Sequence, residues 1–410
     1  MARLLVPLLL ALALDGYGYV VLRSLLADRS AALLRGFTIA WWSVPVLLVA
    51  YLSVAGSGPE ARLPKVVNTL VGAGFFILYF AKFCASVFFL VDDLRRVVAS
   101  VLRRVSSAGA TAFWPDRSRF LTQVGLLAGA LPAATLSYGI LRNPYRYRLH
   151  EVDVPVRGLA PKHEGLRIVQ LSDIHSGSFF RKAPIADGIA LVNDQGADLV
   201  AFTGDLVNAQ ATEIEPYLDV FSRVRSRLGT YSIIGNHDYG DYVAGWGPEE
   251  KAANWARLEA NHAALGWDLL RNEHRILDVD GEPLAIIGTE NWSTIGRFPK
   301  TGDLARAAAG TEGVATKILL SHDPTHWDAQ VRPDYPDIAL QLAGHTHGFQ
   351  FGVEAEWLRW SPSQYVYAQW AGLYTEGHQH LYVNRGFGFL GYPGRVGILP
   401  EVTLLRLVGV

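Results

Sequence analysis

The sequence predicts an α/β protein in two parts, a helical membrane region followed by a layered α/β domain. Long apolar stretches dominate the first 142 residues, and the composition after them is that of an ordinary water-soluble domain. From Leu166 onward, short apolar runs alternate with amphipathic stretches, which is typical of layered α/β folds. The charge divides in the same way. Residues 1–150 hold 16 Lys and Arg against 6 Asp and Glu, and the remainder holds 21 against 32.

Four apolar segments are long enough to cross a bilayer, which takes roughly 20 residues. They are Leu4–Leu26, Phe37–Ala55, Val66–Val91 and Phe120–Leu141. A secretory signal peptide would explain the first segment but not all four. We therefore expect a membrane region with four spans over residues 1–142, a linker with an entry strand over 143–165, and the soluble domain over 166–410.

The positive charges of the loops predict the orientation of these spans. The loop between the third and fourth spans is rich in arginine, with Arg95, Arg96, Arg103, Arg104, Arg117 and Arg119. The first loop carries Arg23, Arg29 and Arg35, whereas the second has only Arg62 and Lys65. By the positive-inside rule the first and third loops are cytoplasmic, so the soluble domain lies outside the cytoplasm. The arginines at 142, 146 and 148, just after the fourth span, weigh against this orientation.

Two charged residues interrupt the spans, Asp15 in the first and Lys82 in the third. Ionisable groups inside a membrane are costly and often functional, so an ion pair with a transport or coupling role is one interpretation. The other is that the two groups snorkel or pair for packing only.

Cys84 is the single cysteine, which excludes a disulfide framework. The acidic soluble part argues against nucleic acid as a partner.

Five predicted strands of the soluble domain are each followed directly by polar side chains. The runs are "LRIVQLSDIH", "DLVAFTGDLVN", "GTYSIIGNHD", "VATKILLSHD" and "DIALQLAGHTH". They end in Asp173 and His175, in Asp205 and Asn208, in Asn236, His237 and Asp238, in His322 and Asp323, and in His345 and His347. Polar groups at the carboxyl ends of several strands build one site in layered α/β folds.

The chemistry of these side chains predicts a metal centre. In an extended segment, His345 and His347 leave on the same side, so we expect the two imidazoles to form one half-site. The candidate ligands are carboxylates, imidazoles and an amide without a thiolate, which suits Mn²⁺, Fe or Zn²⁺. They outnumber the ligands of one tetrahedral ion, so we expect two ions that share a carboxylate. Such a pair activates water and clamps an in-line phosphoryl displacement.

With these motifs in this order, residues Leu166–Leu407 resemble the calcineurin-like metallophosphoesterase superfamily. The sequence is most similar to the membrane-linked bacterial branch, which hydrolyses phosphodiesters or phosphomonoesters, including lipid-linked ones. The resemblance implies a four-layer αββα sandwich with a dinuclear centre at one end. It assigns Asp173, His175 and His347 to the first metal, Asn236, His322 and His345 to the second, Asp205 as the bridge, His237 as the acid for the leaving oxygen, and Asp238 as the group that orients His237.

These features predict a membrane-anchored phosphoesterase with two divalent ions and a phosphoester substrate, lipid-linked or soluble. The alternative is a membrane transport or sensing protein whose outer domain binds metal for regulation. Residues 357–374 are rich in Trp and Tyr, which either enter a membrane interface or pack a loop. Arg385 and Arg395 either contact a phosphate or are loop residues. No predicted strand precedes His378 and His380, so we expect both in a surface loop.

Overall fold

The computed structural model of the chain describes residues 2–55, 63–105 and 115–410, with side chains for all of these except 2–5, 103–105 and 115–118. Four of the arginines that predict the orientation therefore lie outside the described residues or side chains, namely Arg62, Arg103, Arg104 and Arg117. The chain divides into two compact units, Met1–Tyr138 and Gly139–Val410. We call the first the membrane unit, and the second, which holds the predicted site, the catalytic unit.

The membrane unit confirms the predicted spans. Its helices are α1 (Ala2–Leu25), α2 (Ala31–Ala55), α3 (Lys65–Val105) and α4 (Pro115–Arg142), the last of which continues into the catalytic unit. All four are long and apolar enough to cross a membrane. The third is longer than predicted. It continues past Val91 to Val105, and its 41 residues correspond to about 60 Å at 1.5 Å per residue.

Asp15 and Lys82 form an ion pair between α1 and α3. The Asp15 side chain is fully buried, and the hydroxyl of Tyr79 donates to its Oδ2 at 2.8 Å. The Lys82 ammonium also lies 4.4 Å from the centroid of the Trp41 ring on α2. Neither charge snorkels to the surface, since the pair is enclosed by three helices. Each charge is thus compensated within the bundle, which excludes snorkelling.

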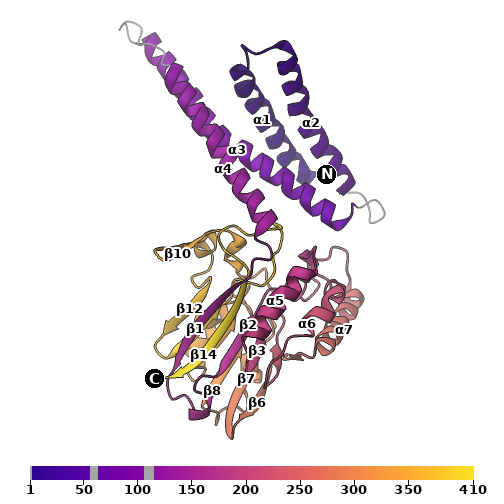
Figure 1. The fold of residues 1–410 in the computed structure, drawn as a ribbon, viewed down its shortest axis with the longest axis vertical. Helices are drawn as coiled ribbons and strands as arrows, with labels where there is room; N and C mark the ends of the chain where they lie inside the picture. Colours follow the sequence, from indigo (N-terminus) through magenta and orange to yellow (C-terminus); the bar gives the residue numbers. More distant parts are fainter. Residues whose placement is uncertain (1, 56–62, 106–114) are drawn as a thin grey trace. The chain divides into compact units, whose positions relative to one another are not determined.

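The catalytic unit is built on two six-stranded sheets (Figure 1). The first has the order β1-β14-β2-β3-β4-β5, with β1 (Arg148–Val156), β14 (Glu401–Gly409), β2 (Arg167–Leu171), β3 (Leu199–Phe202), β4 (Thr230–Ser232) and β5 (Asp268–Leu269). The second has the order β12-β13-β9-β8-β7-β6, with β12 (Gly372–Glu376), β13 (Gln379–Val383), β9 (Leu340–Ala343), β8 (Thr316–Leu320), β7 (Glu282–Gly288) and β6 (Glu273–Val279). A separate hairpin consists of β10 (Val353–Ala355) and β11 (Leu358–Trp360).

Successive residues of the central strands face different layers, as the two-residue period of a strand requires. In β3, Leu199 and Ala201 pack between the two sheets, whereas Val200 and Phe202 pack under the helices of the first sheet. Those helices are α5 (Ala183–Asp194), α6 (Leu218–Phe221) and α7 (Pro248–Leu265). On the second sheet a smaller core lies under α8 (Leu304–Ala308) and the segment Trp327–Val331. The result is the predicted αββα sandwich.

The sheets bring the five motifs to one end of the sandwich. Strands β2, β3 and β4 are parallel neighbours in the first sheet, and β8 and β9 are parallel neighbours in the second. Their carboxyl ends therefore lie at matching edges, and each is followed by one predicted motif.

The expectation that His378 and His380 both lie in a surface loop was wrong for His380. His380 lies in β13, buried, with Nδ1 at 2.9 Å from the Thr375 hydroxyl, whereas His378 is exposed as expected.

Candidate metal centre and catalytic pocket

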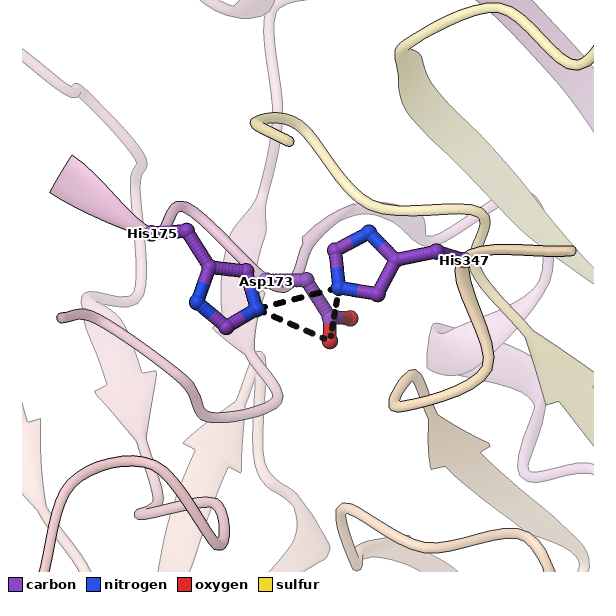
Figure 2. Close-up of side chains that lie close together, drawn as sticks. All are labelled: Asp173, His175 and His347. Carbon is purple, nitrogen blue, oxygen red and sulfur yellow. Dashed lines mark hydrogen bonds and ion pairs between the residues drawn. The ribbon is translucent and has the colours of Figure 1, made fainter. Parts of the chain in front are cut away.

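Three of the predicted ligands converge in a first cluster. Figure 2 shows Asp173, His175 and His347 with their polar atoms turned toward one another. The two Nε2 atoms lie 3.0 Å apart, and His347 Nε2 lies 3.2 Å from Asp173 Oδ1. At such a distance only one proton fits between the two imidazole nitrogens. A cation bound there would accept both lone pairs, which suits a metal site.

Asp205, His322 and His345 form a second cluster beside it. His322 Nε2 lies 3.2 Å from Asp205 Oδ2 and 3.3 Å from His345 Nδ1. Asp205 Oδ2 is also 3.5 Å from His175 Nε2 of the first cluster. One carboxylate therefore lies within reach of both clusters. This contact with both clusters is what the predicted bridging role of Asp205 requires.

Hydrogen bonds outside the second cluster fix which imidazole nitrogens face into it. His322 Nδ1 lies 2.7 Å from the carbonyl oxygen of Thr203, which can only accept, so this nitrogen carries a proton. His345 Nε2 lies 2.9 Å from the Tyr367 hydroxyl. The second nitrogen of each ring, Nε2 of His322 and Nδ1 of His345, therefore points into the cluster. Such outer partners are the usual way in which histidine ligands are oriented.

The backbone at these positions is strained. Asp173, His175, Asp205, His345 and His347 all have positive φ, between 46° and 71°. For residues other than glycine this conformation costs of order 1–3 kcal/mol each and is concentrated at functional sites. The expected half-site of His345 and His347 is therefore wrong. The chain is not extended there, and the two rings enter different clusters.

Two glycines allow the motif loops to approach closely. Gly204 has a φ of +94°, and a Cβ there would come within 2.6 Å of the backbone nitrogen of Gly235. A Cβ on Gly344 would lie 2.2 Å from Asp173 Oδ2. The glycine before His345 is thus required by the Asp173 carboxylate.

Burial and mutual charges determine the protonation of the clusters. Burial by itself would raise the pKa of Asp205, but His322, His237 and His175 hold it well below the usual range. Burial would likewise raise the pKa of Asp173, and His347 lowers it instead. Burial lowers the pKa of His175. Burial would also lower the pKa of His322, but the Asp205 carboxylate raises it to about 10.

The residues present fit divalent metal ions. Seven side chains supply only nitrogen and oxygen, and in the described residues the Oδ1 atom of Asn236 is buried without a hydrogen-bond partner. Its amide nitrogen donates to the Tyr242 hydroxyl at 2.8 Å, so the carbonyl end is the one left for a ligand role. A buried polar atom without a partner is costly unless it binds something. The buried Asn236 oxygen thus fits the ligand role that the resemblance implies.

His237 is held differently from the ligands. Its Nδ1 lies 2.7 Å from the carbonyl oxygen of Asn208, so Nδ1 carries a proton and Nε2 is the other ring nitrogen. The ring stacks on Tyr242 with centroids 4.3 Å apart, and the backbone nitrogen donates to Asp205 Oδ1 at 2.8 Å. His237 also lines the pocket. The ring is therefore positioned without being enclosed by a metal cluster.

The expected role of Asp238 is corrected by the structure. Its carboxylate does not contact the His237 ring. It accepts backbone N–H groups of Asp205, Leu206, Val207 and Gly235, at 2.9 to 3.2 Å. Burial and the Asp205 carboxylate raise the pKa of Asp238 to about 7. Asp238 thus holds the loops after β3 and β4 together, and the Asn208 carbonyl orients His237.

A pocket of about 560 Å³ is lined by His175 and His347 of the first cluster and by Asp205 and His345 of the second. Its walls include residues that the sequence did not predict, namely Tyr242, Arg297, Phe298, Gln350, Leu390 and Tyr392. They come from loops without a recognisable motif, so no signal in a single sequence marks them.

The two arginines that were considered as phosphate ligands have structural roles instead. Arg385 pairs with Glu401 at 2.7 Å, and Arg395 is fully buried and donates to the carbonyls of Arg385 and Gly386.

Tyr242 contacts both Asn236 and His237, which predicts a test. Replacing Tyr242 with Phe removes the hydroxyl that fixes the Asn236 amide and keeps the ring that stacks on His237. We expect the concentration of Mn²⁺ needed for half-maximal activity to rise roughly 10- to 100-fold, with little change in kcat at saturating metal. Tyr239→Phe is the matched control, because the Tyr239 hydroxyl contacts Thr301 and Asn291 instead. An unchanged metal requirement in Tyr242→Phe would contradict this role.

The fold and the site together define a metal-dependent hydrolase of phosphoric esters. A family model described as "Calcineurin-like phosphoesterase" matches residues 166–349. A second, described as "Probable Calcineurin-like phosphoesterase, transmembrane domain", matches residues 2–144. The metallophosphoesterase YkuE of Bacillus subtilis (strain 168) is 30% identical over 301 residues, covering 71% of this chain and 97% of YkuE. The chain belongs to the calcineurin-like metallophosphoesterase family.

Two further relatives carry informative names. The "Transmembrane protein with metallophosphoesterase domain" of Danio rerio is 30% identical over 298 residues, which cover 69% of this chain and only 62% of that protein. The phosphodiesterase YaeI of Escherichia coli (strain K12) is 30% identical over 250 residues, covering 59% of this chain and 82% of YaeI. The four apolar helices and the match to the transmembrane family model make this chain a membrane-linked metallophosphoesterase.

Proposed function

We propose that the protein hydrolyses phosphodiester or phosphomonoester bonds with two divalent ions, Mn²⁺, Fe or Zn²⁺. The observation that carries this proposal is the position of Asp205 between two clusters of nitrogen and oxygen atoms within one pocket. Asp173, His175 and His347 would hold one ion, and Asn236, His322 and His345 the other. Ions held by these residues would supply positive charge for the phosphoryl oxygens and would lower the pKa of a bound water.

The chain's own residues supply the remaining chemistry. In its doubly protonated form, His237 donates the proton from Nε2 to the leaving oxygen and becomes a neutral imidazole, which keeps its Nδ1–H on the Asn208 carbonyl. Tyr242 keeps the ring in place by stacking. Aromatic side chains of the pocket wall, among them Tyr242, Phe298 and Tyr367, offer an apolar surface to an ester substituent.

The first test uses the full-length chain in detergent. Chelation should abolish hydrolysis of bis(p-nitrophenyl) phosphate and p-nitrophenyl phosphate, and added Mn²⁺ should restore it with about two ions per chain. The ratio of the two rates then separates diesterase from monoesterase activity. Full loading with two ions and no turnover of either ester would refute the proposal.

We further propose that the catalytic unit lies outside the cytoplasm, which the arginine-rich first and third loops support. A cysteine at Val410, in a chain with Cys84→Ser, should then react with a membrane-impermeant maleimide in intact cells. Reaction only after lysis would contradict this orientation.

A further inference from the structure

An exposed apolar surface lies beside the catalytic pocket. Of the large apolar side chains that are exposed in residues 139–410, seven fall between Phe349 and Val366, and the other four are Leu141, Tyr242, Ile276 and Val410. We call six of them the aromatic rim: Phe349, Phe351, Val353, Trp357, Leu358 and Tyr365. Such clustering is uncommon on a protein surface that faces only water, and it marks a contact with protein or membrane.

The rim is an ordered structure. It is carried mainly by the β10–β11 hairpin, and Trp357 lies in its turn with 83% of its surface exposed. The Phe351 ring packs edge-on against Trp360, with centroids 6.4 Å apart, and Trp360 Nε1 donates to the Tyr365 hydroxyl at 3.3 Å. The backbone is thus held in place while the apolar side chains remain exposed.

The end of the fourth span contacts the same part of the catalytic unit. Residues Gly139–Arg142 are the last turn of α4 and belong to this unit. The backbone nitrogen of Arg395 donates to the Gly139 carbonyl at 3.3 Å, and Asn143 Nδ2 donates to the Arg395 carbonyl at 2.8 Å. A Cβ on Gly139 would lie 2.9 Å from that carbonyl oxygen. The last turn of the span is therefore packed closely on residues 392–396.

Residues 390–397 join this contact to both the rim and the pocket. Val396 forms a bridge with Phe351, and its carbonyl accepts the backbone N–H of Gly352 at 2.9 Å. Leu390 and Tyr392 of the same segment line the pocket, as does Phe349 of the rim. Within the catalytic unit, residues 390–397 thus connect the last turn of a membrane span to the rim and to the wall of the pocket.

We propose that the aromatic rim contacts the bilayer and that the substrate is an amphipathic phosphoester, one of whose ester groups stays among the lipids. Trp and Tyr prefer the interface between headgroups and acyl chains, and apolar side chains enter the adjoining hydrocarbon. Arg359 of the hairpin and the neighbouring Arg385 both form ion pairs with Glu354, so these two charges are compensated within the protein. The substrate part of this inference rests on the proposed function, whereas the membrane contact does not.

A fluorescence experiment tests the contact. The full-length chain with Cys84→Ser and Glu356→Cys, labelled with an environment-sensitive dye, is placed in nanodiscs of phosphatidylethanolamine and phosphatidylglycerol. Lipids with brominated acyl chains should quench the label, and iodide in the water should not. The matched control is Ile276→Cys, because Ile276 is 49% exposed on β6, an edge strand of the second sheet. At this position iodide should quench the label and brominated lipids should not.

Two results would overturn the membrane contact. A label at 356 that iodide quenches as strongly as the one at 276 would mean that the rim faces water. A label that neither quencher reaches would mean that a protein covers the rim. Quenching by brominated lipid alone supports the contact, whether or not the chain is active.

Two substrates with the same leaving group test the amphipathic phosphoester. The probes are bis(p-nitrophenyl) phosphate in solution and the p-nitrophenyl ester of phosphatidic acid in the nanodisc. In Trp357→Ser with Leu358→Ser, kcat/KM for the lipid ester should fall about tenfold or more, and that for the soluble ester should not change. Equal losses on both would overturn the substrate assignment. If the wild-type chain cleaves neither ester while brominated lipid still quenches the label, the proposed function fails and the membrane contact stands.

Discussion

Asp205→Asn is expected to empty both metal sites and to reduce turnover by roughly 10³-fold or more. Asp205 Oδ2 lies within 3.5 Å of ligand nitrogens in both clusters, so loss of its charge affects both ions at once. Two-metal sites supply several kcal/mol of charge stabilisation in the transition state, and each ~1.4 kcal/mol is a factor of ten in rate.

The choice of asparagine separates this effect from misfolding. Asp205 Oδ1 accepts the backbone N–H of His237 at 2.8 Å, and an asparagine oxygen can accept the same bond. The matched control is Asp153→Asn on β1, an exposed carboxylate that pairs with Arg406. Metal content, turnover and thermal unfolding are measured for both variants. A folded Asp205→Asn protein that keeps full activity would refute the shared carboxylate and with it the two-ion mechanism.

The strands and the ligand types of the site could be predicted from the sequence, because each ligand directly follows a buried apolar run. The end of a run such as "LRIVQL" marks the end of a strand, and parallel strands bring their ends to one edge of a sheet. This reasoning placed Asp173, Asp205 and His322 correctly at strand ends.

The arrangement of ligands within each loop could not be predicted in the same way. His345 and His347 enter different clusters because the backbone there is left-handed, and that conformation depends on contacts such as the one between Gly344 and Asp173. Likewise, Asp238 follows His237 directly in the sequence, yet its carboxylate accepts backbone N–H groups. The His237 ring is held instead by the carbonyl of Asn208. The pocket walls come from irregular loops, where specificity resides and where no period in the sequence marks a position.

His237→Gln is expected to reduce kcat by about 10²- to 10⁴-fold for an ester with a poor leaving group, which is the usual contribution of a general acid. Metal content should not change, because His237 belongs to neither cluster. The loss should depend on the ester. A p-nitrophenolate leaves without a proton, so its rate should fall little, whereas a simple alkyl or phenyl leaving group needs the proton from Nε2.

The dependence on the leaving group distinguishes an acid from a group that merely supports the pocket. If glutamine at 237 disturbed the metals or the walls, all esters would lose rate equally and the metal content would fall. The matched control is His378→Gln, since His378 is exposed and its Nε2 lies 3.0 Å from the carbonyl oxygen of Pro336. Rates for a series of aryl phosphodiesters give a steeper dependence on leaving-group pKa in the His237 variant than in the wild type if Nε2 donates the proton. Parallel lines would refute this assignment and would leave protonation of the leaving oxygen to water.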